Sequence, residues 1–94
     1  MIAKVFLFSS KPNQINNFLS KFYCFKNIEL ANSYSWQKNF SNPVDITELI
    51  ATLVDGINFT DITMWVSLDE DVYIKITSAN ANNVIKYIFE RYPY

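Results

Sequence analysis

The densest group of side chains that could do chemistry is a run of three carboxylates, Asp69, Glu70 and Asp71. Carboxylate oxygens bind hard cations such as Mg²⁺ and Ca²⁺, so the run is a candidate site for a divalent metal. A calcium loop, however, needs further oxygen ligands at fixed spacing and a glycine for its sharp turn, and this segment has neither. We therefore predict a solvated hairpin tip that resists edge aggregation and suits a basic protein partner.

Composition excludes most catalytic arrangements, because the chain has no histidine, one cysteine and one glycine. Without histidine there is no Ser-His-Asp or Cys-His pair, no usual zinc ligand set and no common general base. A single glycine, Gly56, cannot build the glycine-rich loops that bind nucleotides. Cys24 lies near the end of a predicted helix, where the helix dipole disfavours a thiolate, so we expect a small hydrophobic side chain. The composition predicts a protein that is not an enzyme and has no cofactor or metal.

The segment 62–77 alternates apolar residues with polar or aromatic ones, which is typical of a β-hairpin with one buried face. A three-residue loop at 69–71 pairs Val66 with Ile74 and keeps the apolar residues on one face. A two-residue turn would mix the faces, so we predict the three-residue loop.

In that register Trp65 lies opposite Lys75 and diagonal to Tyr73, which gives an aromatic and cationic patch. If no helix covers this face, the patch is an interaction surface; otherwise the last helix or the segment 92–94 folds over it as core. The predicted contact residues are those of this patch and of the acidic run: Trp65, Tyr73, Lys75, Asp69, Glu70 and Asp71.

The first strand is predicted at about residues 2–9, because Val5-Phe6-Leu7-Phe8 is a continuous apolar run typical of a strand in the sheet interior. Its facing stays open: either Phe6 and Phe8, or Val5 and Leu7, extend the aromatic patch. A second strand is predicted from residue 28, where the period becomes two, and either reaches residue 37 or ends before Tyr34.

Three helices follow from apolar residues that recur at three- and four-residue steps. The first has its cap and first turn at residues 10–13, and its apolar positions are Ile15, Phe18, Leu19 and Phe22, with Phe25 left open as a fifth. The second has Asn42 as its N-cap and Pro43 in its first turn, and ends at Gly56. The third is capped by Ser78 or Asn80 and ends at Pro93.

These elements predict a single α+β domain over residues 1–94, with the order β-α-β-α-β-β-α. We expect a two-layer sandwich in which three helices cover mainly one face of a four-stranded mixed sheet. The first two strands should be parallel through a right-handed crossover, and the last two antiparallel.

The net charge of -1 argues against a nucleic-acid partner, since such proteins normally carry a basic face. An open sheet with outward aromatic residues is similar in layout to RNA-recognition domains. Those domains, however, carry aromatic residues amid glycine and basic side chains on their two central strands, and this chain has no such segment. The abundance of residues with AT-rich codons indicates a low-GC, bacterial or phage genome.

We therefore expect a non-enzymatic protein-protein interaction module, for example a small bacterial inhibitor of the immunity or antitoxin type. One alternative is a homo-oligomer that buries the same patch as a homodimer. Another binds a small ligand or a divalent metal through Asp61, Asp69, Asp71 and Lys75. A lone cysteine and the absence of any apolar run near 20 residues favour a cytoplasmic protein without a membrane partner.

Overall fold

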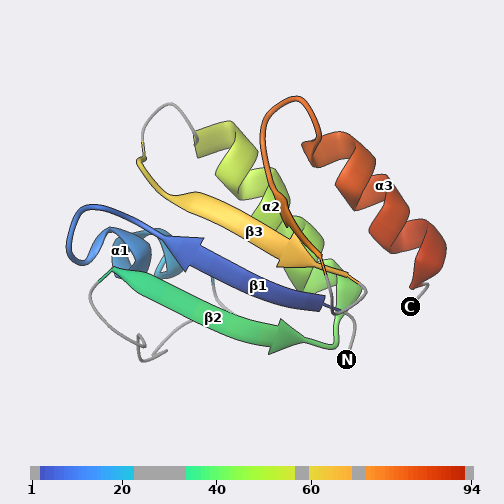
Figure 1. The fold of residues 1–94 in the computed structure, drawn as a ribbon, viewed down its shortest axis with the longest axis horizontal. Helices are drawn as coiled ribbons and strands as arrows, with labels where there is room; N and C mark the ends of the chain where they lie inside the picture. The colour runs from blue at the N-terminus through green and yellow to red at the C-terminus, as the bar shows by residue number, and fades with distance from the viewer. Residues whose placement is uncertain (1–2, 23–33, 57–59, 69–71, 93–94) are drawn as a thin grey trace.

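A four-stranded sheet and three helices form the fold (Figure 1). The computed structural model describes residues 3–22, 34–56, 60–68 and 72–92. The strands are β1 (Ala3–Phe8), β2 (Ser35–Phe40), β3 (Thr63–Ser67) and β4 (Tyr73–Lys75), and the helices are α1 (Gln14–Leu19), α2 (Pro43–Gly56) and α3 (Ala81–Arg91). The α+β class and the order β-α-β-α-β-β-α are confirmed.

The sheet has the order β2-β1-β3-β4, and all three neighbouring pairs are antiparallel. The expected mixed sheet, with β1 and β2 parallel, is therefore wrong. A parallel return must carry the chain back along the whole of β1, but α1 has only six residues and is about 9 Å long. The backbone N–H of Ser9 donates to the carbonyl of Tyr34 at 2.8 Å, so β2 begins beside the end of β1 and runs the opposite way.

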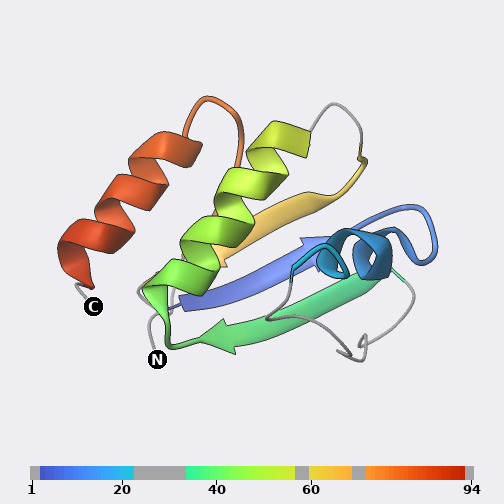
Figure 2. The ribbon, with the colours of Figure 1, turned by 180° about the vertical axis from the view of Figure 1, so that it is seen from behind.

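All three helices lie on the same face of the sheet, as Figure 2 shows, while no described helix lies over the face turned to the viewer in Figure 1. We call these the helix side and the outer face. This arrangement is compatible with the predicted two-layer sandwich. The core lies on the helix side and is built from alternate strand residues and the apolar stripes of the helices, among them Val5, Leu7, Met64, Val66, Trp36, Ile46, Leu49, Ile50, Leu53 and Ile88.

Helix α2 begins where the sequence predicts it. The side-chain oxygen of Asn42 accepts a hydrogen bond from the N–H of Val44 at 2.8 Å, which satisfies one of the donors that a helix start leaves without a partner. Pro43, the first helical residue, has no N–H to satisfy.

Two predicted boundaries differ from the structure. Helix α1 ends at Leu19, although Phe22 is buried as its spacing predicts, and Cys24 lies outside the described residues. Strand β2 begins at Ser35, so it overlaps the predicted strand only at its last three residues. Lys38 lies on the helix side of β2, at the exposed edge of the sheet, between the buried Trp36 and Phe40. A lysine at this position interrupts the apolar alternation, so the sequence pattern does not indicate this strand.

Candidate functional site

The outer face of β1 carries two phenylalanines. Val5 and Leu7 are buried on the helix side, at 1% and 0% exposure, so the pleat turns Phe6 and Phe8 outward. This decides which pair extends the predicted patch. Phe8 is 42% exposed, a high value for an aromatic side chain in a central strand.

The hairpin between β3 and β4 brings a tryptophan and a lysine beside these rings. Trp65 pairs with Lys75 and Val66 with Ile74, which confirms the predicted register. On its other side Trp65 pairs with Phe6, and their ring centroids lie 5.7 Å apart at an interplanar angle of 51°. Such a tilted contact lets the positive edge of one ring meet the negative face of the other.

Tyr73 completes the patch from β4 and is 47% exposed. We call the group formed by Phe6, Phe8, Trp65, Tyr73 and Lys75 the aromatic face. Phe6, Trp65 and Tyr73 line a shallow hollow of about 320 Å³ on this surface. Helix α3 lies on the opposite side of the sheet, so the aromatic face is not covered by that helix (Figures 1 and 2).

Charge is distributed unevenly between the two layers. The charged residues of the four strands are all lysines, Lys4, Lys38 and Lys75, and Lys4 and Lys75 lie on the outer face. In the helix layer, α2 carries three carboxylates, at Asp45, Glu48 and Asp55, and α3 carries one carboxylate and two basic side chains. The outer side of the strands is thus locally basic, although the whole chain has a charge of -1.

The acidic run Asp69, Glu70 and Asp71 lies outside the described residues, so its predicted role as a contact or metal site stays a prediction. Within the ranges that the structure describes, no three Asp, Glu, Cys or His side chains cluster as metal ligands would. Asp61, the remaining acidic candidate, lies just before β3 and is engaged in hydrogen bonds.

The Asp61 carboxylate accepts hydrogen bonds from the hydroxyls of Ser9 and Ser10 and, at 3.2 Å, from the backbone N–H of Ser10. These bonds lower the pKa of Asp61 below its ordinary value of 3.8. The bond from the Ser10 hydroxyl has the largest effect, and the bond from the Ser9 hydroxyl has the next largest. The group ties the end of β1 to the start of β3, which is a structural role. Sequence reasoning missed it because the partners lie 51 and 52 positions apart and no local pattern links them.

Comparisons with models of known protein families, with curated proteins and with solved structures found no match. In the described part of the chain, no helix is long and apolar enough to cross a membrane. The residues of the site therefore carry the functional argument.

Proposed function

We propose that this protein is a non-enzymatic interaction module that binds a protein partner through its aromatic face. The observation that carries the proposal is the exposure of Phe8 and Tyr73, at 42% and 47%, on a sheet face opposite all three helices. Phe6 and Trp65, both half-buried, lie between Phe8 and Tyr73 and join them into one surface. A contiguous apolar surface is typical of binding sites, whereas single exposed apolar residues are common on any protein.

The aromatic face has the physical properties of a contact surface. Aromatic side chains bury a large area and have few rotatable bonds, so ordering them on binding costs little conformational entropy. Here the contact between Phe6 and Trp65 already restrains both rings before a partner arrives. Surfaces that bind through a few dominant residues are enriched in tryptophan and tyrosine.

The lysines of the outer face favour a partner with carboxylates opposite Lys4 and Lys75. None of the four described strands carries an acidic residue, so Lys4 and Lys75 attract a carboxylate that approaches the outer side of these strands. We propose an acidic partner surface with apolar residues at its centre.

Stacked nucleic-acid bases are the competing ligand, because Phe6, Phe8 and Trp65 lie on the two central strands. A protein partner is favoured because binding along a nucleic-acid backbone uses many cationic contacts, and the strands place only two lysines on the outer face. The experiment below distinguishes the two ligands.

Site-specific photo-crosslinking in the native host tests the proposal. A photoreactive phenylalanine derivative replaces Phe8 in one variant and Glu48, an exposed residue of α2, in the control. We expect a cross-linked protein at position 8 that is missing at position 48, and mass spectrometry identifies it. Equal products at both positions, or cross-links to nucleic acid alone, would overturn the proposal. A product formed from two copies of this chain would support the homo-oligomer instead.

The purified partner then allows a quantitative test. Phe8→Ala and Lys75→Glu should each weaken its binding by about tenfold or more, the effect expected at a dominant contact. Glu48→Ala is the matched control, since it changes an exposed side chain on the helix layer and should leave the affinity unchanged. Unchanged affinity in both outer-face variants contradicts the proposed surface.

A further inference from the structure

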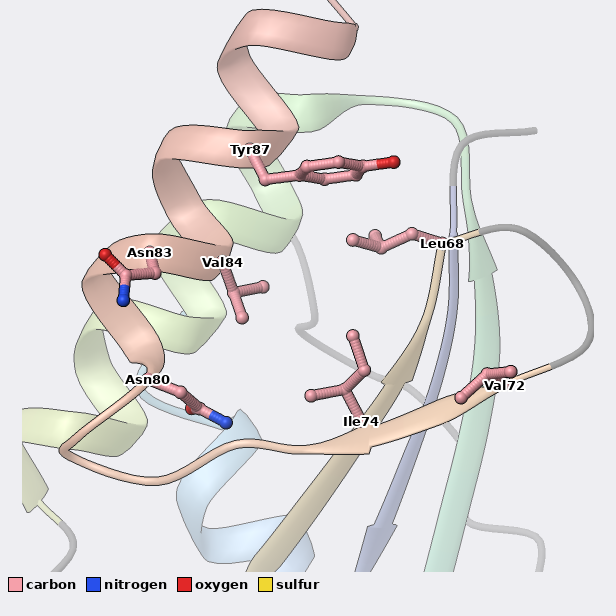
Figure 3. A pocket seen from close by; sticks show the side chains of 7 residues that line it. All are labelled: Leu68, Val72, Ile74, Asn80, Asn83, Val84 and Tyr87. Carbon is pink, nitrogen blue, oxygen red and sulfur yellow. The ribbon is translucent and has the colours of Figure 1, made fainter.

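A groove of about 590 Å³ lies between the edge strand β4 and helix α3, on the helix side of the sheet (Figure 3). Its lining is mostly apolar. Ile74 comes from β4, Val84 and Tyr87 come from α3, Leu68 follows β3 and Val72 precedes β4, and Asn80 and Asn83 also line it. Figure 3 shows Val84 and Tyr87 on the helix facing Leu68 and Ile74 across the gap. Val72 is 67% exposed and Ile74 38%, although both belong to the apolar alternation of the hairpin.

Hydrogen bonds near both ends of α3 join the helix to the sheet. Near the helix start, the side-chain amide of Asn80 donates to the carbonyl of Lys75 at 2.8 Å. At the helix end, the hydroxyl of Tyr92 donates to the carbonyl of Leu68 at 3.0 Å. The helix is thus fixed to the sheet at two points, and the apolar side chains between them do not close the space.

The backbone of β4 presents hydrogen-bonding groups along the same groove. The N–H of Ile76 donates to the carbonyl of Met64 at 2.8 Å, so alternate residues, Ile74 and Ile76, turn their backbone groups toward β3. By the same alternation, the backbone groups of Tyr73 and Lys75 point away from β3, to the edge of the sheet. We call this row the β4 edge.

Asn80 shows how the β4 edge accepts a partner. Its carboxamide donates to the Lys75 carbonyl and accepts from the N–H of Thr77, both at 2.8 Å. These two bonds go to the residues on either side of Ile76. In a parallel pair of strands, one residue bonds in this way to the two residues that flank the one opposite it. Asn80 therefore occupies one position of a missing strand, and the positions beside Tyr73 come next along the edge.

We infer that the β4 edge and the groove bind an extended peptide segment of a partner protein by strand addition. In an extended chain, successive side chains point to opposite faces, so alternate residues of the peptide would enter the groove and the others would join the outer face. The groove requires apolar side chains, because its described lining contains no charged residue. Lys75 on the outer side favours a carboxylate between them. The expected ligand thus alternates apolar and acidic residues.

An extended peptide suits this site better than a compact apolar ligand. The site combines an apolar groove with a row of backbone donors and acceptors, and a peptide backbone satisfies such a row. A compact apolar ligand would fill the groove but leave the β4 edge without partners. This inference uses the edge of β4 and the groove rather than the rings of Phe6, Phe8 and Trp65, and it shares only Tyr73 and Lys75 with the aromatic face.

A short, capped peptide that alternates valine and glutamate is the direct probe. When it is titrated into the isotopically labelled protein, we expect the amides of Tyr73 and Lys75 to become protected from hydrogen exchange. The same peptide with N-methylated amides on its β4-facing residues should bind about tenfold more weakly, because it keeps its side chains but loses strand hydrogen bonds. A peptide that alternates valine and lysine should also bind less tightly. Absence of protection at millimolar peptide, or equal binding by the N-methylated peptide, would overturn the inference.

Two variants at one position separate the backbone from the side chain. Tyr73→Pro removes an N–H at the β4 edge without removing a bond to β3, whereas Tyr73→Ala keeps the N–H and removes the ring. We expect peptide binding to be lost in Tyr73→Pro and kept in Tyr73→Ala. Phe8→Ala, which damages the aromatic face, should leave peptide binding intact, so the two proposals can fail separately. Protection of Tyr73 that rises with protein concentration, without peptide, would show instead that a second copy occupies the edge.

Discussion

The two sides of β1 differ completely in their surroundings, although both are apolar. Leu7 is 0% exposed and lies in the core beneath the helices, whereas its neighbour Phe8 is 42% exposed on the outer face. Hydrophobicity alone does not separate the two residues, since both belong to the run Val5-Phe6-Leu7-Phe8. They differ in the side of the sheet that they face, and the helices pack on only one side. Burial in β1 is therefore determined by the layers rather than by the strand.

Truncation of these neighbours gives the largest expected effect. Leu7→Ala should lower the free energy of unfolding by about 2–5 kcal/mol, because it leaves a cavity in a packed core. Phe8→Ala should lower it by less, about 1 kcal/mol, since 42% of the Phe8 side chain is exposed and its loss leaves no enclosed cavity. Chemical denaturation of both variants measures the difference. Equal losses would mean that the outer face is also core, and the docking surface would then disappear.

The sequence pattern predicted the register of the hairpin, but not the facing of β1 or the direction of β2. Alternation in the hairpin determined the register of Val66 with Ile74, because only one loop length keeps the apolar residues on a single face. Alternation is absent in β1, so its facing could not be predicted. The direction of β2 was predicted wrongly because a strand, a helix and a strand suggest a parallel crossover. Helix α1 has only six residues and does not run back along the whole strand as a crossover helix does. Lys38 interrupts the alternation of β2, so the pattern did not indicate where that strand lies.

The candidate site was predictable to a similar extent. Trp65, Tyr73 and Lys75 follow from the hairpin register, and the structure adds Phe6 and Phe8. The groove beneath α3 was not predictable, because it depends on hydrogen bonds from Asn80 and Tyr92 that fix the helix position. The distance between α3 and the sheet, which makes the groove, leaves no pattern in the sequence.

At the end of the sheet, around Asp61, polar contacts rather than packing join the strands. Its hydrogen bonds from Ser10 and Ser9 hold the folded-state pKa below 3.8, so the carboxylate stabilises the fold fully above that pH. The stabilisation is lost as the pH falls through the folded-state pKa. Asp61→Asn should therefore destabilise the protein near neutral pH, by less than Leu7→Ala does, because the carboxylate is accessible to solvent.

The difference between Asp61→Asn and the unchanged protein should then shrink in acid, below pH 3.8. Thermal unfolding of both proteins across this range measures it. The Glu48→Ala variant controls for the general loss of stability on acidification, because Glu48 lies on an exposed position of α2. A difference that does not change with pH would show that the geometry of the side chain matters and its charge does not.

Ser67 is the exception to the contrast between the two faces, and its truncation has the smallest expected effect. It belongs to the outer face, between Lys4 and Tyr73, yet it is 1% exposed, and its hydroxyl has no hydrogen-bond partner among the described residues. A buried hydroxyl without a partner costs about 1–3 kcal/mol, and this cost offsets the small packing loss on truncation. Ser67→Ala should therefore leave the free energy of unfolding within about 1 kcal/mol of the original or raise it.

Ser9→Ala is the matched control for Ser67→Ala. Ser9 is equally buried, at 0% exposure, but its hydroxyl contacts Asp61 and accepts a hydrogen bond from the N–H of Lys11 at 3.1 Å. Its truncation should lower the free energy of unfolding by about 1 kcal/mol or more, because it removes the hydrogen bonds that the buried hydroxyl makes with Asp61 and Lys11. If Ser67→Ala destabilised the protein as much as Ser9→Ala, the Ser67 hydroxyl would have a partner in solution. The outer face around Ser67 would then contain a hydrogen-bonded polar group, and Ser67 would not simply be packed beside the aromatic face.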